Sequence, residues 1–247
     1  MRIILLLLAA FLAFAQQNSP AEISICHATV VDVAAGAELK DQTVTIRGER
    51  IQSVAPTTSG DTNLPCALDA HGAYLIPGLW DMHIHVHDTH ELPLYIANGV
   101  TGVRIMSRDK NTAGLRKELA KETPSPEIYL ASAIVDGSPP AWPGSIVVKK
   151  PADARRAVDE IKAGGADFVK VYNRIPRDAY FSLAEEAKQQ HIDFAGHVPE
   201  AITAQEASAA GQRSMEHLQG IALGCSSRQH ALMGDLEGPD SFATGWP

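Results

Sequence analysis

Residue types that bind metals recur along this chain at the spacing of a repeating strand–helix unit. His83 and His85 end an apolar run, Lys170 lies 85 residues beyond His85, His197 follows 27 residues later, and His217 follows after another 20. A (β/α)8 barrel uses roughly 25–31 residues for each strand–helix unit, so 85 residues correspond to about three units. The spacing therefore predicts strands 1, 4, 5 and 6 of such a barrel, each with one of these side chains near its C-terminal end.

The two histidines His83 and His85 lie two residues apart in a run that follows a break at Pro77-Gly78. Side chains two residues apart on a strand point to the same face, about 6.6 Å apart along the chain, so both rings can reach one metal ion. Such a pair also occurs on exposed strands, so it is weak evidence by itself. A pair formed by His85 and His87 is a competing choice of ligands.

Two stretches carry a resemblance to a known family. The first resembles the first-strand signature of the amidohydrolase superfamily, more narrowly of its imidazolonepropionase-like and prolidase-like members, and has the sequence Pro77-Gly78-Leu79-Trp80-Asp81-Met82-His83-Ile84-His85. The second is similar to their second strand, with Gly102 where the family more often has a threonine, and has the sequence Gly99-Val100-Thr101-Gly102-Val103-Arg104. The resemblance runs from about Ile25 to Gly220. It implies an α/β fold, an incomplete TIM (β/α)8 barrel of about six strands preceded by a small β-sandwich domain.

The resemblance also implies metal ligands. His83 and His85 would hold one divalent metal ion, His197 and His217 a second, and Lys170, carboxylated on its amine by carbon dioxide, would bridge the two. A lysine ammonium has no acceptor for a cation, whereas the neutral amine, favoured in a low-dielectric site, can add carbon dioxide. Imidazole and carboxylate suit zinc, which is the default metal. The alternative for Lys170 is a side chain that extends from a strand end to solvent.

The activity implied by the resemblance is hydrolysis of a C–N bond in a small amide, a dipeptide or a cyclic amide. Two metal ions roughly 3.5–4 Å apart would share a hydroxide and polarise the substrate carbonyl. Arg104 would bind a substrate carboxylate, or pair with a structural acid. Tyr172 would donate to an oxyanion, or pack inside the barrel. Trp142, in a loop expected over the mouth of the barrel, is a substrate wall or a residue held by its own packing.

The chain is expected to divide into four parts. Residues 1–15 are predicted to be a signal peptide, 23–76 the N-terminal part of the small β-sandwich domain, 77–223 barrel strands 1 to 6, and 224–247 an irregular tail. Only 30 residues follow His217, whereas two further units need about 50–60. The family's strand-8 aspartate, which accepts the proton of the attacking water, is therefore expected to be missing. We expect little turnover. The alternative is a non-catalytic metal-binding remnant or a fragment of a longer hydrolase.

The N-terminus has the pattern of an export signal. Arg2 precedes an apolar run from Ile3 to Phe14, and Ala13-Phe14-Ala15 forms a small-x-small cleavage site. The run is too short for a stable membrane span, which needs about 20 residues. The mature protein is therefore expected in a periplasm or outside the cell.

Composition limits the partners. The net charge is −8 and the chain has no run of lysine and arginine, which argues against nucleic acid as a partner. A small-molecule substrate is expected, and so is association with a second copy, because an incomplete barrel leaves strand edges open. One of the three cysteines must be unpaired within the chain; Cys26 and Cys66 form either a disulfide or two buried thiols.

Overall fold

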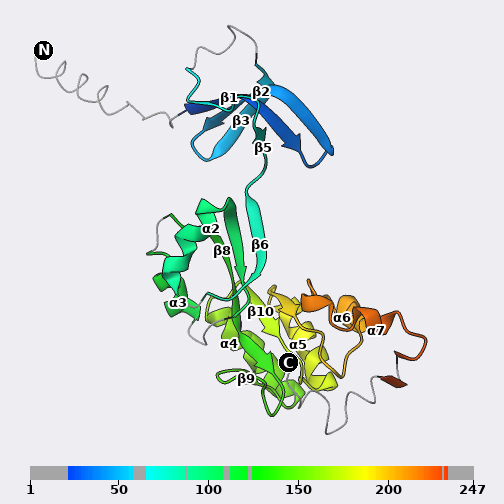
Figure 1. The fold of residues 1–247 in the computed structure, drawn as a ribbon. Helices are drawn as coiled ribbons and strands as arrows, with labels where there is room; N and C mark the ends of the chain where they lie inside the picture. The colour runs from blue at the N-terminus through cyan, green and yellow to red at the C-terminus, as the bar shows by residue number, and fades with distance from the viewer. Residues whose placement is uncertain are drawn as a thin grey trace, which may run out of the picture. The chain divides into compact units, whose positions relative to one another are not determined.

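The computed structural model describes residues 22–57, 65–86, 88–107, 112–121, 124–229 and 231–232 (Figure 1). The chain forms two compact units, one that ends at Pro77 and one that begins at Gly78. The expected signal peptide at 1–15 lies outside the described residues, as do His87 and most of the expected tail at 224–247. All five expected metal ligands belong to the second unit.

The first unit is one mixed sheet in the described residues. Its strands are β1 (Glu22–Asp32), β2 (Ala37–Arg47), β3 (Arg50–Pro56), β4 (Leu68–Asp69) and β5 (Tyr74–Leu75). The first three pair antiparallel, while β4 and β5 join β1 in parallel. The turn between β2 and β3 holds Gly48 at a φ of 59°, which glycine adopts without steric cost. This small sheet domain agrees with the predicted small β-sandwich domain that precedes the barrel.

Cys26 and Cys66 form a disulfide, which decides between the two alternatives left open by the sequence. Cys26 is buried in β1 and Cys66 lies just before β4. The bond therefore ties the segment that leads into β4 to the central strand of the sheet.

The second unit is built on a parallel sheet. Its five main strands follow one another in the sheet as they do in the chain: β6 (Leu79–Ile84), β7 (Val100–Ile105), β8 (Glu127–Asp136), β10 (Phe168–Val171) and β11 (Asp193–Gly196). The two-residue strand β9 (Ile146–Val147) pairs with the end of β8. Consecutive parallel strands joined by crossovers are the pattern of a (β/α)8 barrel, and the predicted partial barrel is confirmed. The predicted sixth strand is reduced to one parallel bridge between Gly196 and Met215.

Two helices beside this sheet have apolar residues at the i, i+3, i+4, i+7 spacing that is typical of an amphipathic helix. Helix α4 (Pro151–Ala163) begins with proline in its first turn and buries Ala154, Ala157, Val158 and Ile161. Helix α5 (Arg177–Gln189) buries Tyr180, Leu183 and Ala187, and both helices share a core with β10 and β11. The other helical segments are η1 (Thr89–Glu91), α2 (Leu92–Ala97), α3 (Thr112–Leu119), α6 (Ala204–Ala209), η2 (Glu216–Leu218) and α7 (Ile221–Gly224).

A second core lies between the first strands of the parallel sheet and helices α2 and α3, which Figure 1 shows beside them. It contains Ile84 of β6, Ile105 of β7, Leu92 of α2 and Leu115 of α3. These contacts fix the end of β6, where the histidine pair begins. Among the described helices, none combines the length and apolar character needed to cross a membrane.

Candidate functional site

A cavity of about 880 Å³ lies where the parallel strands of the second unit end. Its lining includes all five residues selected by their spacing: His83, His85, Lys170, His197 and His217. His83 lies in β6, Lys170 in β10, and His197 directly after β11. The carboxyl ends of parallel strands are where barrel enzymes bind their substrates. The structure therefore brings five residues from distant parts of the sequence to one concave surface.

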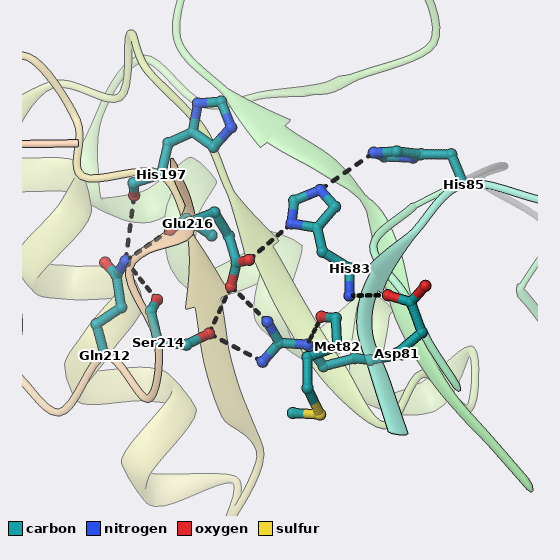
Figure 2. A network of polar contacts seen from close by, with 10 residues as sticks. Asp81, Met82, His83, His85, His197, Gln212, Ser214 and Glu216 are labelled. Carbon is teal, nitrogen blue, oxygen red and sulfur yellow. Dashed lines mark hydrogen bonds and ion pairs between the residues drawn. The ribbon is translucent and has the colours of Figure 1, made fainter. Parts of the chain in front are cut away.

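The rings of His83 and His85 face each other through their Nε2 atoms, which lie 3.3 Å apart (Figure 2). Nδ1 of His83 lies 2.6 Å from a carboxylate oxygen of Glu216, and Nδ1 of His85 lies 3.1 Å from the carbonyl oxygen of Ser107. A carboxylate or carbonyl oxygen only accepts, so Nδ1 carries the proton in each neutral ring. Two Nε2 lone pairs therefore point at each other, an arrangement that a cation between the rings would stabilise.

His197 and His217 lie beside this pair. Nδ1 of His197 donates to Oδ1 of Asn173 at 2.6 Å, which leaves Nε2 with the lone pair. The ring centroid of His217 lies 5.0 Å from that of His197 and 4.8 Å from that of His83. Burial, together with the charge of Lys170, lowers the pKa of His197 to about 3. The ring is therefore neutral at neutral pH, the form in which imidazole binds metals.

Lys170 is buried in β10, with 1% of its surface exposed, between the fully buried residues Val169 and Val171. The alternative that its side chain extends to solvent is therefore wrong. Burial is the main cause that lowers the pKa of this amine to about 8; the charge of Arg104 lowers it further and Glu216 opposes the shift. With such a pKa, roughly a tenth of the amine is neutral at pH 7. The neutral form is the one that can react with carbon dioxide.

Glu216, which was not among the predicted site residues, holds several of them in place (Figure 2). Its carboxylate is buried and accepts hydrogen bonds from Arg104 Nη2 at 2.5 Å, from Ser214 Oγ at 2.6 Å and from His83 Nδ1 at 2.6 Å. Burial acts to raise the pKa of this carboxyl, but the hydrogen bonds from Ser214 and His83 and the Arg104 charge bring it below its ordinary value. The available sequence signal was an acidic residue directly before the predicted ligand His217.

The two other predicted catalytic residues take different positions. The guanidinium of Arg104 is buried and donates to the Met82 carbonyl at 2.7 Å and to Ser214 Oγ at 2.9 Å, besides its ion pair with Glu216. Arg104 thus pairs with a structural acid, as its alternative had it, and direct contact with a substrate stays a prediction. Tyr172 lines the cavity, with its ring centroid 4.1 Å from that of His197.

Three histidines at this cavity are in the chemical form that binds a divalent metal ion. Three of the imidazoles have Nδ1 committed to a protein oxygen and keep a lone pair on Nε2, the usual state of a histidine ligand. Within the described ranges, however, no three histidine, cysteine or carboxylate side chains are grouped closely enough to hold an ion as they stand. The features of this cavity that favour a metal ion are therefore the type of its donors and their tautomers.

Comparison with known sequences finds partial similarity. No family profile matches the chain. It is 35% identical over 100 residues to an adenine deaminase of Klebsiella pneumoniae subsp. pneumoniae, an alignment that covers 36% of this chain and 15% of the deaminase. It is 32% identical over 125 residues to an adenine deaminase of Rubrobacter xylanophilus, with 45% and 20% covered. The alignments thus span only a small part of these curated relatives.

Comparison with solved structures identifies several proteins that share the fold of this chain. A Xaa-Pro dipeptidase with bound methionine superposes with a TM-score of 0.69 at 17% identity, over 87% of this chain and 65% of the dipeptidase. Bottromycin amidohydrolase gives a TM-score of 0.66 at 23% identity, over 82% and 44% of the two chains. A putative prolidase from Bifidobacterium longum gives 0.62 at 21% identity, over 78% and 52%. The chain therefore shares their architecture while it spans less than two thirds of each.

Proposed function

Because the chain has the fold of the amidohydrolase superfamily and shares part of its sequence with members of it, we propose that its cavity hydrolyses a carbon–nitrogen bond with the help of divalent metal ions. The observation that supports this best is the presence of four imidazoles and a buried lysine on one cavity lining. His83 and His85 would hold one ion, His197 and His217 a second, and Lys170, as a carbamate, would bridge them. Zinc is the metal that these donors suit best.

The residues of the chain have separate tasks in this proposal. The metal ions, when bound, would supply an activated water and polarise the carbon that it attacks. Glu216 and Asn173 fix the tautomers of His83 and His197. Arg104 balances the buried charge of Glu216 and acts through it. Tyr172, in contact with His197, would donate its hydroxyl proton to the oxyanion that develops on the substrate.

The carboxylate expected to accept the proton of the attacking water has no counterpart on the described lining of the cavity. Among the described lining residues there is no aspartate or glutamate. General-base catalysis typically contributes about 10²–10⁴-fold in rate. We therefore expect the 247-residue chain to bind metal and to turn over slowly. Metal binding without catalysis is the alternative function favoured by the same observation.

A second candidate reaction is hydrolytic removal of an amino group from a nitrogen heterocycle. The observation in its favour is the partial identity to adenine deaminases. The competing substrate class, a peptide-like amide, is favoured by the shared fold with a Xaa-Pro dipeptidase and a prolidase. Both reactions break a carbon–nitrogen bond. They are distinguished by incubating the chain with adenine and with a dipeptide and measuring the product of each reaction.

We also propose that the protein is exported. The N-terminal leader pattern supports this. The disulfide between Cys26 and Cys66 supports it as well, because such bonds persist mainly in oxidising compartments.

Metal content and turnover of the purified chain test the proposed function. We expect up to two zinc ions per chain by elemental analysis, and slow hydrolysis of amides, dipeptides or adenine that a chelator abolishes. His197→Ala should weaken metal binding by at least about 100-fold. Loss of a residue that only hydrogen-bonds a ligand lowers metal affinity by about 10–100-fold, and loss of a ligand itself should lower it more. His191→Ala, at an exposed histidine just after α5, is the matched control and should keep the metal. A chain that binds no divalent metal would refute the proposal, while bound metal without turnover supports the non-catalytic alternative.

A further inference from the structure

The segment between β8 and β9 presents an indole to the cavity. Trp142 lines the cavity and remains 56% exposed. Its Nε1–H donates to the hydroxyl oxygen of Tyr172 at 2.9 Å, and its carbonyl oxygen accepts from Ser145 Oγ at 2.8 Å. Because the only polar atom of the indole already has a partner, the ring offers a ligand only its apolar surface. Trp142 and Tyr172 together form what we call the aromatic wall.

The segment that carries Trp142 is held in place by hydrogen bonds to a buried carboxylate. Asp136, with none of its surface exposed, accepts from the backbone N–H groups of Gly137 and Ala141 at 2.8 Å each and of Arg174 at 2.7 Å. The Arg174 guanidinium in turn donates to the carbonyl oxygen of Pro139 at 2.9 Å. The wall is therefore in place before a ligand arrives, and binding against it costs little ordering entropy.

The aromatic wall adjoins the residues proposed to act on the substrate. The ring of Tyr172 packs on His197 with centroids 4.1 Å apart and planes inclined by 30°. Tyr172 thus contacts both Trp142 and the imidazole of His197. The lining of the cavity also includes four apolar residues: Val86, Ala133, Ile134 and Pro143.

Charge at the cavity selects against a cationic ligand group on this wall. The lining contains Lys170 and four imidazoles, and in the part of the chain that the structure describes it contains no carboxylate. An exposed indole can attract a cation through its ring face, but here any metal ion bound in the cavity would repel a second cation. The apolar surface of Trp142 therefore suits an uncharged group.

We infer that Trp142, held by Tyr172, is a specificity-determining residue that recognises an uncharged ring beside the bond to be cleaved. The substrate class is then a ring-bearing amide or amine, as opposed to a small aliphatic or cationic one. The place of the cleaved bond rests on the proposed function, whereas the binding of a ring on the wall does not require turnover.

Direct binding to the full chain tests this inference. By calorimetry, N-acetyl-L-phenylalaninamide should bind at least about tenfold more tightly than N-acetylglycinamide, because a ring stacked on the indole gains contact area and aromatic attraction. N-acetyl-L-lysinamide should bind no more tightly than the glycine probe. Trp142→Ala should remove most of the tenfold preference, and Trp142→Phe should retain most of it. Tyr74→Ala, at an exposed aromatic residue of the first unit, is the control and should leave the affinities of all three probes unchanged.

Equal affinities for the phenylalanine and glycine probes, no binding of either, or a preference that survives Trp142→Ala would each overturn the inference. Its failure can be told apart from that of the proposed function. Ring-dependent binding without hydrolysis counts against the proposed function alone. Hydrolysis of both probes with equal KM values, unchanged by Trp142→Ala, counts against the aromatic wall alone.

Discussion

At the scale of single residues, three histidines of the cavity are oriented by oxygen atoms. Each oxygen accepts a hydrogen bond from the Nδ1–H of one ring and so fixes its tautomer. Glu216, Ser107 and Asn173 supply these oxygens to His83, His85 and His197. Of the three, Glu216 is the only charged acceptor, and it also neutralises the buried Arg104. Its loss should therefore have consequences beyond the orientation of one ring.

We expect Glu216→Gln to lower the free energy of unfolding by about 3–5 kcal/mol, because it leaves the Arg104 charge buried without an opposite charge. In ¹⁵N NMR spectra of the metal-free chain, the His83 ring should also lose its fixed Nδ1–H tautomer. Glu186→Gln is a matched control at a similarly buried glutamate on α5 that bonds Gln190, and it should cost below about 1 kcal/mol. Full stability together with an unchanged His83 tautomer in Glu216→Gln would show that the network does not position this ring.

The sequence could predict the histidines and Lys170 but not the oxygens that orient them. The predicted residues lie near strand ends at a regular spacing, and that regularity is visible in one dimension. Glu216 and His83 are 133 positions apart, and their contact depends on how β6 and the segment after β11 meet in space. No local pattern encodes such a meeting.

At the scale of elements, helices α4 and α5 agree with the spacing of their apolar residues, whereas the predicted sixth strand did not form. Helices α4 and α5 bury the residues that their periodicity selects. The segment that was predicted as a sixth strand makes a single bridge at Met215 and then turns into η2, with His217 at a φ of 57°. The hydrogen bonds of Glu216 with Arg104 and His83 occur at this turn. The spacing predicted a strand here, whereas the segment turns where Glu216 makes these contacts.

Helix α6, which precedes this turn, has a capping box that makes its stability depend on pH. Thr203 Oγ1 accepts from the Glu206 N–H at 3.1 Å, and the Glu206 carboxylate accepts from the Thr203 N–H at 2.9 Å. Glu206 also forms an ion pair with Arg177 of α5. The hydrogen bond from Arg177 is the main cause that lowers the pKa of Glu206 to about 2.

Because this pKa is lowered in the folded state, the contribution of Glu206 is present above the ordinary glutamate pKa of about 4.3 and is lost as the pH falls toward about 2. Glu206→Gln should therefore destabilise the protein by about 0.5–1 kcal/mol at neutral pH and flatten this part of the acid-unfolding profile. Urea unfolding at a series of pH values measures both effects. Glu185→Gln, on the exposed side of α5, should leave the profile unchanged. A profile for Glu206→Gln that parallels the native one would contradict this account.

At the scale of the whole molecule, β6 is an end strand of the parallel sheet and pairs, among the described residues, with a neighbour on one side only. Leu79, Trp80 and Met82 of this strand are exposed. The presence of a partial barrel followed from the spacing of strand–helix units. In the first unit, the short strands β4 and β5 could not be predicted, because each has two residues and gives no periodic signal.

The first unit depends on a covalent link as well as on its sheet. Cys26 and Cys66 are 40 positions apart. Closing a loop of that length stabilises a folded domain by about 4 kcal/mol in the chain-entropy model, chiefly by restricting the unfolded chain. Replacing both residues by serine should lower the unfolding temperature of the first unit by calorimetry, and a reductant should do the same to the native chain. Cys225→Ser removes the free, exposed thiol and is the matched control, with no expected shift. Equal unfolding temperatures for the double variant and this control would mean that β1 holds its neighbours without the disulfide.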